Sequence, residues 1–242
     1  MSDAWIDIPG APDADMLLIA DHASNRLPEG LDLGVPPQAM QEHVALDIGV
    51  APLSDILCKD LGCAAVLGGV SRLLIDLNRE EDAAGLIPLT SDGYSIPGNT
   101  GLTEAERAAR VALYWQPYHD HIADLILEYR PKLLISLHSF TPRLTTDAAE
   151  RPWQIGILYN RDDRAARLAL PLLEQEGIVA GDNLPYSGQV LNATMNRHGE
   201  ANGIAYLGIE VRQDLISDDD GVARWADRLA TIIRPVRDGL AA

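Results

Sequence analysis

The sequence lacks the residues and segments that mark several large classes of protein. It has two cysteines, Cys58 and Cys63, which are five positions apart and do not form a CxxC motif. Two cysteines cannot build a disulfide framework or a cysteine-rich zinc site, so we expect buried thiols in a reducing cytoplasm. No apolar run approaches the roughly 18 residues needed to cross a bilayer, and no signal peptide is recognisable. These absences predict a soluble, cytoplasmic protein.

Basic residues are also scarce, since 19 of them face 36 acidic residues and the formal net charge is −17. This excess argues against a surface that binds nucleic acid or an anionic membrane. It does not restrict the substrate, because a few arginines can set the field inside a pocket of an acidic protein. Hydrophobic residues make up 47% of the chain, enough for the core of one α/β domain over residues 1–242.

Three common functional motifs are missing as well. The chain contains no GxGxxG, no GxxxxGK[ST] and no GxSxG. Their absence argues against the common nucleotide-binding sites and against a serine hydrolase. A triad built on Ser139 would need an elbow flanked by glycines, but Phe-Thr-Pro follows this serine.

What the sequence does contain is a repeated construction, an apolar run of strand length that ends abruptly in polar residues. One run ends in His22, a second in His138 and a third in Glu210. Apolar runs without alternation predict strands covered on both faces, as in a parallel sheet. Functional groups gather just beyond the carboxyl ends of such strands. Two imidazoles to hold a divalent ion and a carboxylate to activate water are what a metal-assisted hydrolase requires.

A histidine and an aspartate lie four residues apart in a segment with helical spacing that Pro36-Pro37 opens. On a helix, His43 and Asp47 would share one face. A hydrogen-bonded pair facing solvent is the alternative to a functional pair. Asp47 is followed by Ile-Gly-Val-Ala-Pro, so we expect it to be partly buried, where a cation would be a suitable partner.

Two arginines mark a dense polar cluster at the end of a short strand expected over residues 71–76. Arg72 and Arg79 can each bind a carboxylate through two parallel hydrogen bonds, which a lysine does less well. A surface cluster of salt bridges is the alternative, because acidic residues occupy positions 80–82.

Helix and loop signals predict most of the remaining elements. A threonine cap with glutamate three residues on begins a helix over residues 103–129, which Pro117 should kink or break. On that helix His119 and His121 would point about 200° apart, so we expect core or pocket wall and no ligand pair. Further helices are expected at 51–61, 161–176 and 218–238, strands at 64–68 and 153–159, a polar lead-in at 1–15, a long loop at 83–102 and a turn at 196–199.

With these residues in view, the chain resembles the N-formylglutamate amidohydrolase family. The family is similar in fold to the zinc carboxypeptidases and the aspartoacylases. The resemblance therefore implies an α/β fold, a three-layer α/β/α sandwich with a mixed, mostly parallel sheet. It runs from about residue 16 to residue 215. The matching pieces are Asp21-His-Ala-Ser-Asn, His43-Val-Ala-Leu-Asp-Ile-Gly, Ser71-Arg-Leu-Leu-Ile-Asp-Leu-Asn-Arg, Leu137-His-Ser-Phe-Thr-Pro, Arg151-Pro-Trp and Ile209-Glu-Val-Arg-Gln-Asp.

The resemblance implies a metal site with one zinc ion per chain. His22 and His138 would be two of its ligands. Aspartoacylase-like relatives carry His-x-x-Glu as their first ligand pair, whereas this chain has Asn25 at the glutamate position. Asp47 is the candidate that replaces the glutamate, and His43 is the alternative.

The resemblance also implies a general base and a pocket for the substrate. Glu210 would take a proton from the attacking water and return it to the leaving amine. Asn78 and Arg79 belong to an Asp-Leu-Asn-Arg stretch similar to the one that receives the substrate carboxylate in aspartoacylases. Further candidates for binding the substrate are Arg72, Arg212, Tyr186 and His198.

Together these observations predict a zinc-dependent amidohydrolase that acts on a small molecule with a carboxylate. The expected reaction is cleavage of the amide of a small N-acyl amino acid, by preference N-formyl-L-glutamate to formate and L-glutamate. Hydrolysis of another N-acyl amino acid or of a short peptide stays open. So does a non-catalytic small-molecule binding protein that has lost its metal, which Asn25 would permit.

Overall fold

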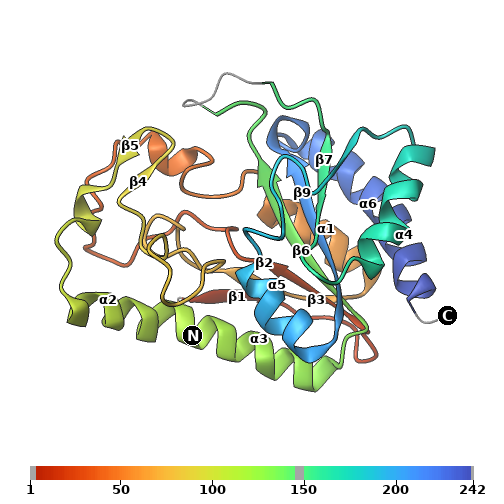
Figure 1. The fold of residues 1–242 in the computed structure, drawn as a ribbon, viewed down its shortest axis with the longest axis horizontal. Helices are drawn as coiled ribbons and strands as arrows, with labels where there is room; N and C mark the ends of the chain where they lie inside the picture. The colour runs from red at the N-terminus through yellow and green to blue at the C-terminus, as the bar shows by residue number, and fades with distance from the viewer. Residues whose placement is uncertain (1–3, 145–149, 241–242) are drawn as a thin grey trace.

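The computed structural model describes residues 4–144 and 150–240 and has a seven-stranded mixed sheet at its centre (Figure 1). In spatial order the strands are β1 (Trp5–Ile8), β3 (Ala64–Gly68), β2 (Met16–Ala20), β6 (Leu133–Phe140), β9 (Ala205–Arg212), β7 (Ile155–Leu158) and β8 (Ala180–Asp182). The four strands from β3 to β9 run parallel, whereas β1 and β7 pair antiparallel with their neighbours β3 and β9. The predicted mixed, mostly parallel sheet is confirmed.

Helices cover both faces of this sheet. The helices are α1 (Val50–Leu61), α2 (Glu104–Arg110), α3 (Gln116–Tyr129), α4 (Arg164–Gln175), α5 (Ala193–His198) and α6 (Asp219–Gly239). Alternate residues of β2 belong to different cores, because successive strand side chains point to opposite faces. Leu18 packs in the core beneath α1, α4 and α6, whereas Leu17 and Ile19 pack in the core beneath α3 and α5. The three-layer sandwich is therefore confirmed.

The long helical region begins at the predicted threonine cap, but at Pro117 it is not broken. Thr103 and Glu106 form the expected capping box. Before Pro117, which has no N–H to donate, the chain widens into a π-helical turn, η3 (Val111–Trp115). The region is therefore one long rod in Figure 1 and is not broken.

Two expected elements are absent, and both segments are turns. The segment around His43 and Asp47 is not helical, because the Asp47 N–H donates to the carbonyl of His22 (2.8 Å) instead of to a residue one turn back. Residues 71–76 do not form a strand either, since the N–H groups of Leu74 and Ile75 donate to the carbonyl of Ser71 (2.9 and 3.4 Å) and close a turn. A hydrogen bond to a distant residue therefore replaces the expected helix in the first segment, and local turn bonds replace the expected strand in the second.

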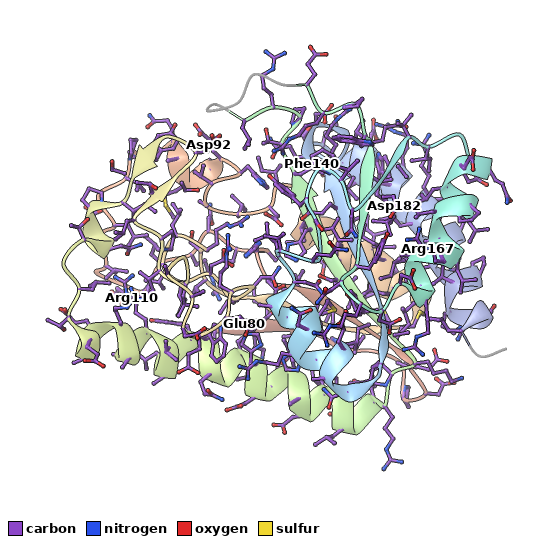
Figure 2. All side chains as sticks on the ribbon, viewed as in Figure 1. Glu80, Asp92, Arg110, Phe140, Arg167 and Asp182 are labelled. Carbon is purple, nitrogen blue, oxygen red and sulfur yellow. The ribbon has the colours of Figure 1, made fainter. Side chains whose placement is uncertain are left out.

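Several short elements were not predicted. The lead-in contains β1, and residues 196–199 include the last turn of α5 and no separate turn. The loop at 83–102 is anchored by the buried Arg110, whose guanidinium donates to Asn99 Oδ1 and to the carbonyls of Leu74 and Gly98 (Figure 2). The short elements are β4 (Thr90–Ser91), β5 (Tyr94–Ser95), η1 (Ala39–Gln41), η2 (Pro97–Asn99), η4 (Glu200–Asn202) and η5 (Gln213–Leu215).

The cysteines and the helices bear on two expectations from the composition. Cys58 and Cys63 are free and buried, as predicted. In the part of the chain that the structure describes, no helix combines the length and the apolar character needed to cross a bilayer.

The chain is closely packed at Gly49, a glycine next to the expected metal site. Gly49 has φ +80°, and an added Cβ would overlap the carbonyl oxygen of Ile216. Gly30 has a similar φ of +77° with open space around it. We expect Gly30→Ala to cost about 1 kcal/mol through backbone strain and Gly49→Ala roughly 1–3 kcal/mol more through overpacking. Urea unfolding of both variants measures the difference, and equal losses would contradict the close packing.

Candidate active site

The three strand ends expected to carry the chemistry meet at one edge of the sheet. His22 directly follows Asp21 after β2, His138 lies near the end of β6, and Glu210 lies near the end of β9. The register of β6 and β9 places His138 and Glu210 side by side. All three line one cavity of about 230 Å³. The topology thus brings together residues that are up to 188 positions apart (210 − 22).

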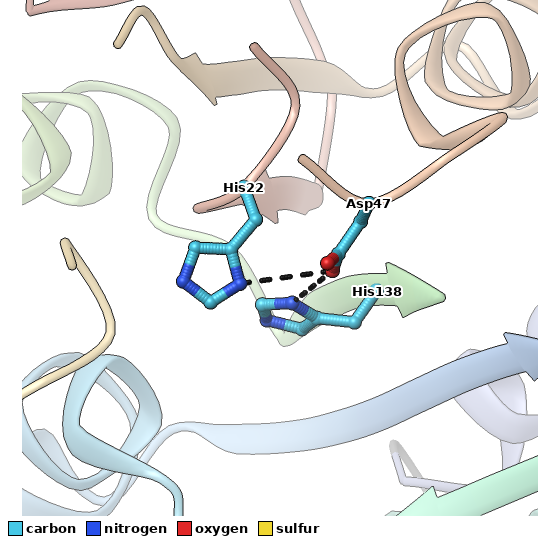
Figure 3. Close-up of side chains that lie close together, drawn as sticks. All are labelled: His22, Asp47 and His138. Atoms are coloured by element: carbon cyan, nitrogen blue, oxygen red, sulfur yellow. Dashed lines mark hydrogen bonds and ion pairs between the residues drawn. The ribbon is translucent and has the colours of Figure 1, made fainter. Parts of the chain in front are cut away.

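Asp47 joins the two histidines to form a compact, buried cluster (Figure 3). Its Oδ2 lies 2.9 Å from Nδ1 of His138 and 3.7 Å from Nδ1 of His22. One possible ligand atom from each of the three residues lies within 4.8 Å of the other two. The cluster therefore offers two imidazole nitrogens and one carboxylate oxygen that lie close enough together to hold one ion.

The outer nitrogen of each imidazole faces a second carboxylate. Nε2 of His22 is 2.6 Å from Asp76 Oδ1. Nε2 of His138 is 3.3 Å from Asp21 Oδ2, an ion-pair distance without hydrogen-bond geometry. A carboxylate behind each ring favours a proton on Nε2 and directs Nδ1 into the cluster, as is usual for metal-binding histidines.

These two outer carboxylates are themselves held in place. Asp21 Oδ1 accepts hydrogen bonds from the hydroxyls of Tyr118 (3.0 Å) and Thr194 (2.9 Å). Asp76 Oδ1 accepts the N–H of Asn78 (3.0 Å). Sequence reasoning did not assign a site role to Asp21 or Asp76, although both are part of the motifs quoted above. In the sequence, Asp21 directly precedes His22, and Asp76 lies between Arg72 and Arg79. These positions were the signal that could have identified both carboxylates.

Opposite charges determine the protonation of the cluster. Burial would raise the pKa of the Asp47 carboxyl, but the hydrogen bond to His138 and the charges of His22 and Arg72 hold this pKa well below its ordinary value. Burial disfavours a charged imidazole, yet the carboxylates of Asp21 and Asp47 raise the pKa of His138 well above its ordinary value. His138 therefore shares a proton on Nδ1 with an ionised Asp47.

The three residues fit a divalent ion such as zinc. Nδ1 of His22 is buried and has no hydrogen-bond partner among the described residues. Ligand atoms about 2.1 Å from a tetrahedral zinc ion lie roughly 3.4 Å from one another. The separations of 2.9 Å and 3.7 Å from Asp47 bracket this value. An ion bound there would give His22 a partner and take the place of the proton on His138.

The two candidates for the third ligand are in different positions. Asp47 is part of the cluster, whereas Nδ1 of His43 lies 3.7 Å from the other oxygen of Asp47, Oδ1, and points to this carboxylate from outside. Burial lowers the pKa of His43 to about 4, so its ring is neutral at pH 7. Asn25 lies outside the cavity lining and donates to the carbonyl of Met40 (2.7 Å). The asparagine therefore does not remove the third ligand atom, because Asp47 offers one from another segment.

Arg72 and Arg79 both line the cavity but have different neighbours. Nη1 of Arg72 donates to Asp47 Oδ1 (3.1 Å), and its Nη2 lies 3.6 Å from Asp76 Oδ2. Arg79 Nε lies 3.6 Å from Asp76 Oδ2, and its side chain is 38% exposed. Asn78 also lines the cavity. Arg72 is thus held between two carboxylates, and Arg79 is the more accessible cation.

Tyr186 lines the cavity and is held there by an arginine with no predicted site role. Nη1 of Arg151 donates to the Tyr186 hydroxyl (3.0 Å) and to the carbonyl of Thr141 (3.1 Å). The Arg151 guanidinium lies 4.9 Å from the centre of the Tyr186 ring. The Arg151-Pro-Trp motif was the sequence signal for this support.

Two other predicted substrate-binding residues do not line this cavity. Arg212 forms an ion pair with Asp214 (2.7 Å), and His198 is buried with its Nε2 3.0 Å from Nδ1 of His119. Burial lowers the pKa of His198 to about 3 and that of His119 to about 4, so both rings are neutral. Their positions give no support to the predicted substrate contacts of Arg212 and His198, whereas His119 is buried, as expected.

Glu210 is a buried carboxyl group with few partners that would stabilise its negative charge. Its relative exposure is 9%, and its Oε2 has no hydrogen-bond partner among the described residues. Burial and the charge of Asp47 raise the pKa of Glu210 to about 7, against the opposing effects of His138 and Arg72. A carboxyl group with this pKa can both accept and donate a proton near neutral pH.

Comparisons with known proteins bear on the fold and the family. The model of the N-formylglutamate amidohydrolase family (FGase) matches residues 14–217. The crystal structure of a gene product from Agrobacterium tumefaciens is 30% identical over 99% of this chain and 96% of that chain, with a TM-score of 0.94. N-formylglutamate amidohydrolase from Ralstonia eutropha JMP134 is 18% identical over 99% and 98%, with a TM-score of 0.76, which shows a shared fold. A search of curated proteins gave no significant match.

The third ligand can be tested with a matched pair of variants. Asp47→Asn keeps the size of the side chain but removes the negative charge from the cluster. We expect it to weaken zinc binding by more than the roughly 10–100-fold that loss of an outer partner costs. His43→Ala should bind zinc almost normally, because its ring lies outside the cluster. Titration with a competing chelator measures both affinities, and the reverse order would identify His43 as the ligand.

Proposed function

The chain belongs to the N-formylglutamate amidohydrolase family, and from this premise we propose that it is a metal-dependent hydrolase of small N-acyl amino acids. The observation that carries the proposal is a cluster of two imidazoles and a carboxylate in the same cavity as Glu210. The specific reaction suggested by the family is hydrolysis of N-formyl-L-glutamate to formate and L-glutamate. Zinc is the ion that we propose, because the donor set of two nitrogens and one oxygen suits it.

His22, Asp47 and His138 are the residues that would hold the ion. When bound, the ion would supply a Lewis acid for the scissile carbonyl and lower the pKa of a water molecule. Asp76 and Asp21 would keep the two imidazoles aligned from behind, at 2.6 Å and 3.3 Å.

Glu210 is the residue that we propose as the general base. Its carboxylate would accept a proton from the attacking water and then deliver that proton to the nitrogen of the leaving amine. Its pKa of about 7 supports both transfers, since neither form is strongly preferred near neutral pH. Its place beside His138 in the sheet register puts the base next to a proposed ligand of the ion.

Arg79 and Asn78 are proposed to bind the carboxylate of the substrate. Arg79 is accessible and has one carboxylate neighbour at 3.6 Å, so its guanidinium can turn to a ligand. A charge-assisted pair between guanidinium and carboxylate would orient the amide within the cavity. Arg72 mainly neutralises Asp47 and Asp76.

The direct test is to measure metal content and formate release on the same preparation. We expect about one divalent ion per chain, loss of formate release after chelation and recovery when zinc is restored. His138→Ala should lack both the ion and the activity. Formate release that persists in chelated protein would overturn the proposed role of the metal, and bound metal without hydrolysis of any N-acyl amino acid would overturn the proposed reaction.

The general base has a test of its own. Glu210→Gln should retain the fold and the metal but lower kcat by roughly 10²–10⁴. In the unaltered enzyme kcat/KM should rise with pH and level off near or below pH 7, because the base must be ionised and a nearby cation lowers its pKa. This rise should be absent in the variant.

Asp214→Asn is the matched control for this test, because Asp214 is a carboxylate outside the cavity that pairs with Arg212. Its kcat should be close to normal. Near-normal kcat in Glu210→Gln would show that another group is the base.

A further inference from the structure

The two residues proposed to bind the substrate carboxylate, Asn78 and Arg79, lie on a turn over residues 77–79 that belongs to no strand or helix. Leu77, which begins this turn, is 1% exposed. A buried carbonyl outside a strand or helix needs a hydrogen-bond donor from another part of the chain. The position of the two substrate-binding side chains therefore depends on the groups that hold the carbonyls of the turn.

Two buried side chains of the long helical rod reach these carbonyls. Nε1 of Trp115, the last residue of η3, donates to the carbonyl of Arg79 (3.0 Å). Nε2 of His119 in α3 lies 3.0 Å from the carbonyl of Leu77. A carbonyl oxygen can only accept, so the imidazole has to carry its proton on Nε2 in order to form this bond.

A second buried histidine completes the arrangement. His198 is the last residue of α5, which packs against α3 (Figure 1), and its Nε2 lies 3.0 Å from Nδ1 of His119. Burial lowers the pKa of His119 to about 4 and that of His198 to about 3, so each ring carries one proton at pH 7. Since the proton of His119 is on Nε2, its Nδ1 accepts and His198 donates. The hydrogen bonds therefore run in one direction, from α5 through His119 to the turn.

Helix α5 also holds one of the two substrate-binding side chains. The N–H of Thr194 donates to Oδ1 of Asn78 (3.1 Å), which leaves the NH2 group of this amide for a ligand. Asn78 and Arg79 both line the cavity. The turn thus faces the cavity with two side chains and is held on its other side by α3 and α5.

We propose that His119, with His198 bonded behind it, is a positioning residue that holds the turn in the place where Asn78 and Arg79 meet the substrate carboxylate. Neither histidine lines the cavity, so both act through the turn and not on the substrate. A contact that is already in place before binding costs less to form than one that has to be ordered. The inference rests on the proposed function of Asn78 and Arg79 and adds the residues that orient them.

A matched pair of variants separates the bond to the turn from the rest of the imidazole. The amide of glutamine can place an N–H where His119 has Nε2, whereas the shorter asparagine reaches only the position of Nδ1. We expect His119→Asn to raise KM for N-formyl-L-glutamate about tenfold in the zinc-loaded enzyme. Its kcat should stay within about twofold, because Glu210 and the three residues proposed to hold the ion lie on other segments.

His119→Gln should restore most of the lost affinity, because its amide can donate to the carbonyl of Leu77. His121→Asn is the control on the same helix, since Nε2 of His121 faces Asp7 (2.7 Å) instead of the turn, and its KM should be normal. Equal KM values in the two His119 variants would overturn the inference, even if both variants lose stability, because that result would show a role in packing alone.

The protons of the two imidazoles can be located by ¹⁵N NMR of the unaltered protein, without a variant or a substrate. We expect both rings to be protonated on Nε2, with the His198 proton hydrogen-bonded to Nδ1 of His119. A proton on Nδ1 of His119 would overturn the inference, because the ring would then donate to His198 and would have no proton for the turn.

Hydrogen exchange at the backbone N–H groups of Asn78 and Arg79 keeps the inference separate from the proposed function. Faster exchange in His119→Asn than in His119→Gln would support the hold on the turn, whether or not the unaltered enzyme releases formate. Equal exchange in the two variants would overturn it. Failure of the proposed function would instead appear as absent formate release by the unaltered, zinc-loaded enzyme.

Discussion

The site depends on one buried carboxylate, that of Asp47, whose relative exposure is 2%. A charged group removed from water is stable only if the surrounding residues compensate for its charge. Asp47 meets this need with His138 at 2.9 Å, Arg72 at 3.1 Å and the N–H of Ser139 at 3.3 Å. These partners come from two distant segments of the chain, so the burial of one side chain draws those segments together at the edge of the sheet.

Charges alternate outward from Asp47. Asp21, His138, Asp47, His22 and Asp76 follow one another in space, so that each imidazole lies between two carboxylates. Arg72 bridges Asp47 and Asp76 beside this row. Carboxylates outnumber permanent cations in the arrangement. A divalent ion at its centre would correct this imbalance.

The sequence was sufficient to predict those parts of the site that follow from strand patterns. The apolar runs before His22 and His138 identified two proposed ligands, and the same logic located Glu210, because parallel strands end at a common edge. The third ligand could be narrowed only to Asp47 or His43. Their segment has helical spacing, but its conformation is determined by a hydrogen bond from Asp47 to His22, 25 residues away (47 − 22). Local periodicity carries no information about such a bond.

Arg72 and Arg212 show what the sequence pattern alone does not separate. Arg72 and Arg212 each lie near strand-end motifs and looked equally suitable for the substrate. Asp214, two residues after Arg212, captures that guanidinium at the surface. Asp76, four residues after Arg72 in the sequence, is buried behind His22 and together with Asp47 holds the arginine at the cavity. Each arginine therefore pairs with a nearby acidic residue. The buried Asp76 keeps Arg72 at the site, whereas the exposed Asp214 keeps Arg212 in an ion pair outside it.

The outer carboxylates also connect the site to the packing of the fold. Asp21 is held by Tyr118 of α3 and Thr194 of α5, and Tyr118 is a fully buried member of the core on that face of the sheet. A shift of either helix would move the carboxylate that faces His138, even though neither helix provides a residue of the His22–Asp47–His138 cluster. Close-packed cores transmit such shifts instead of absorbing them. The alignment of the proposed metal ligands therefore depends on core residues that never touch the ion or the substrate.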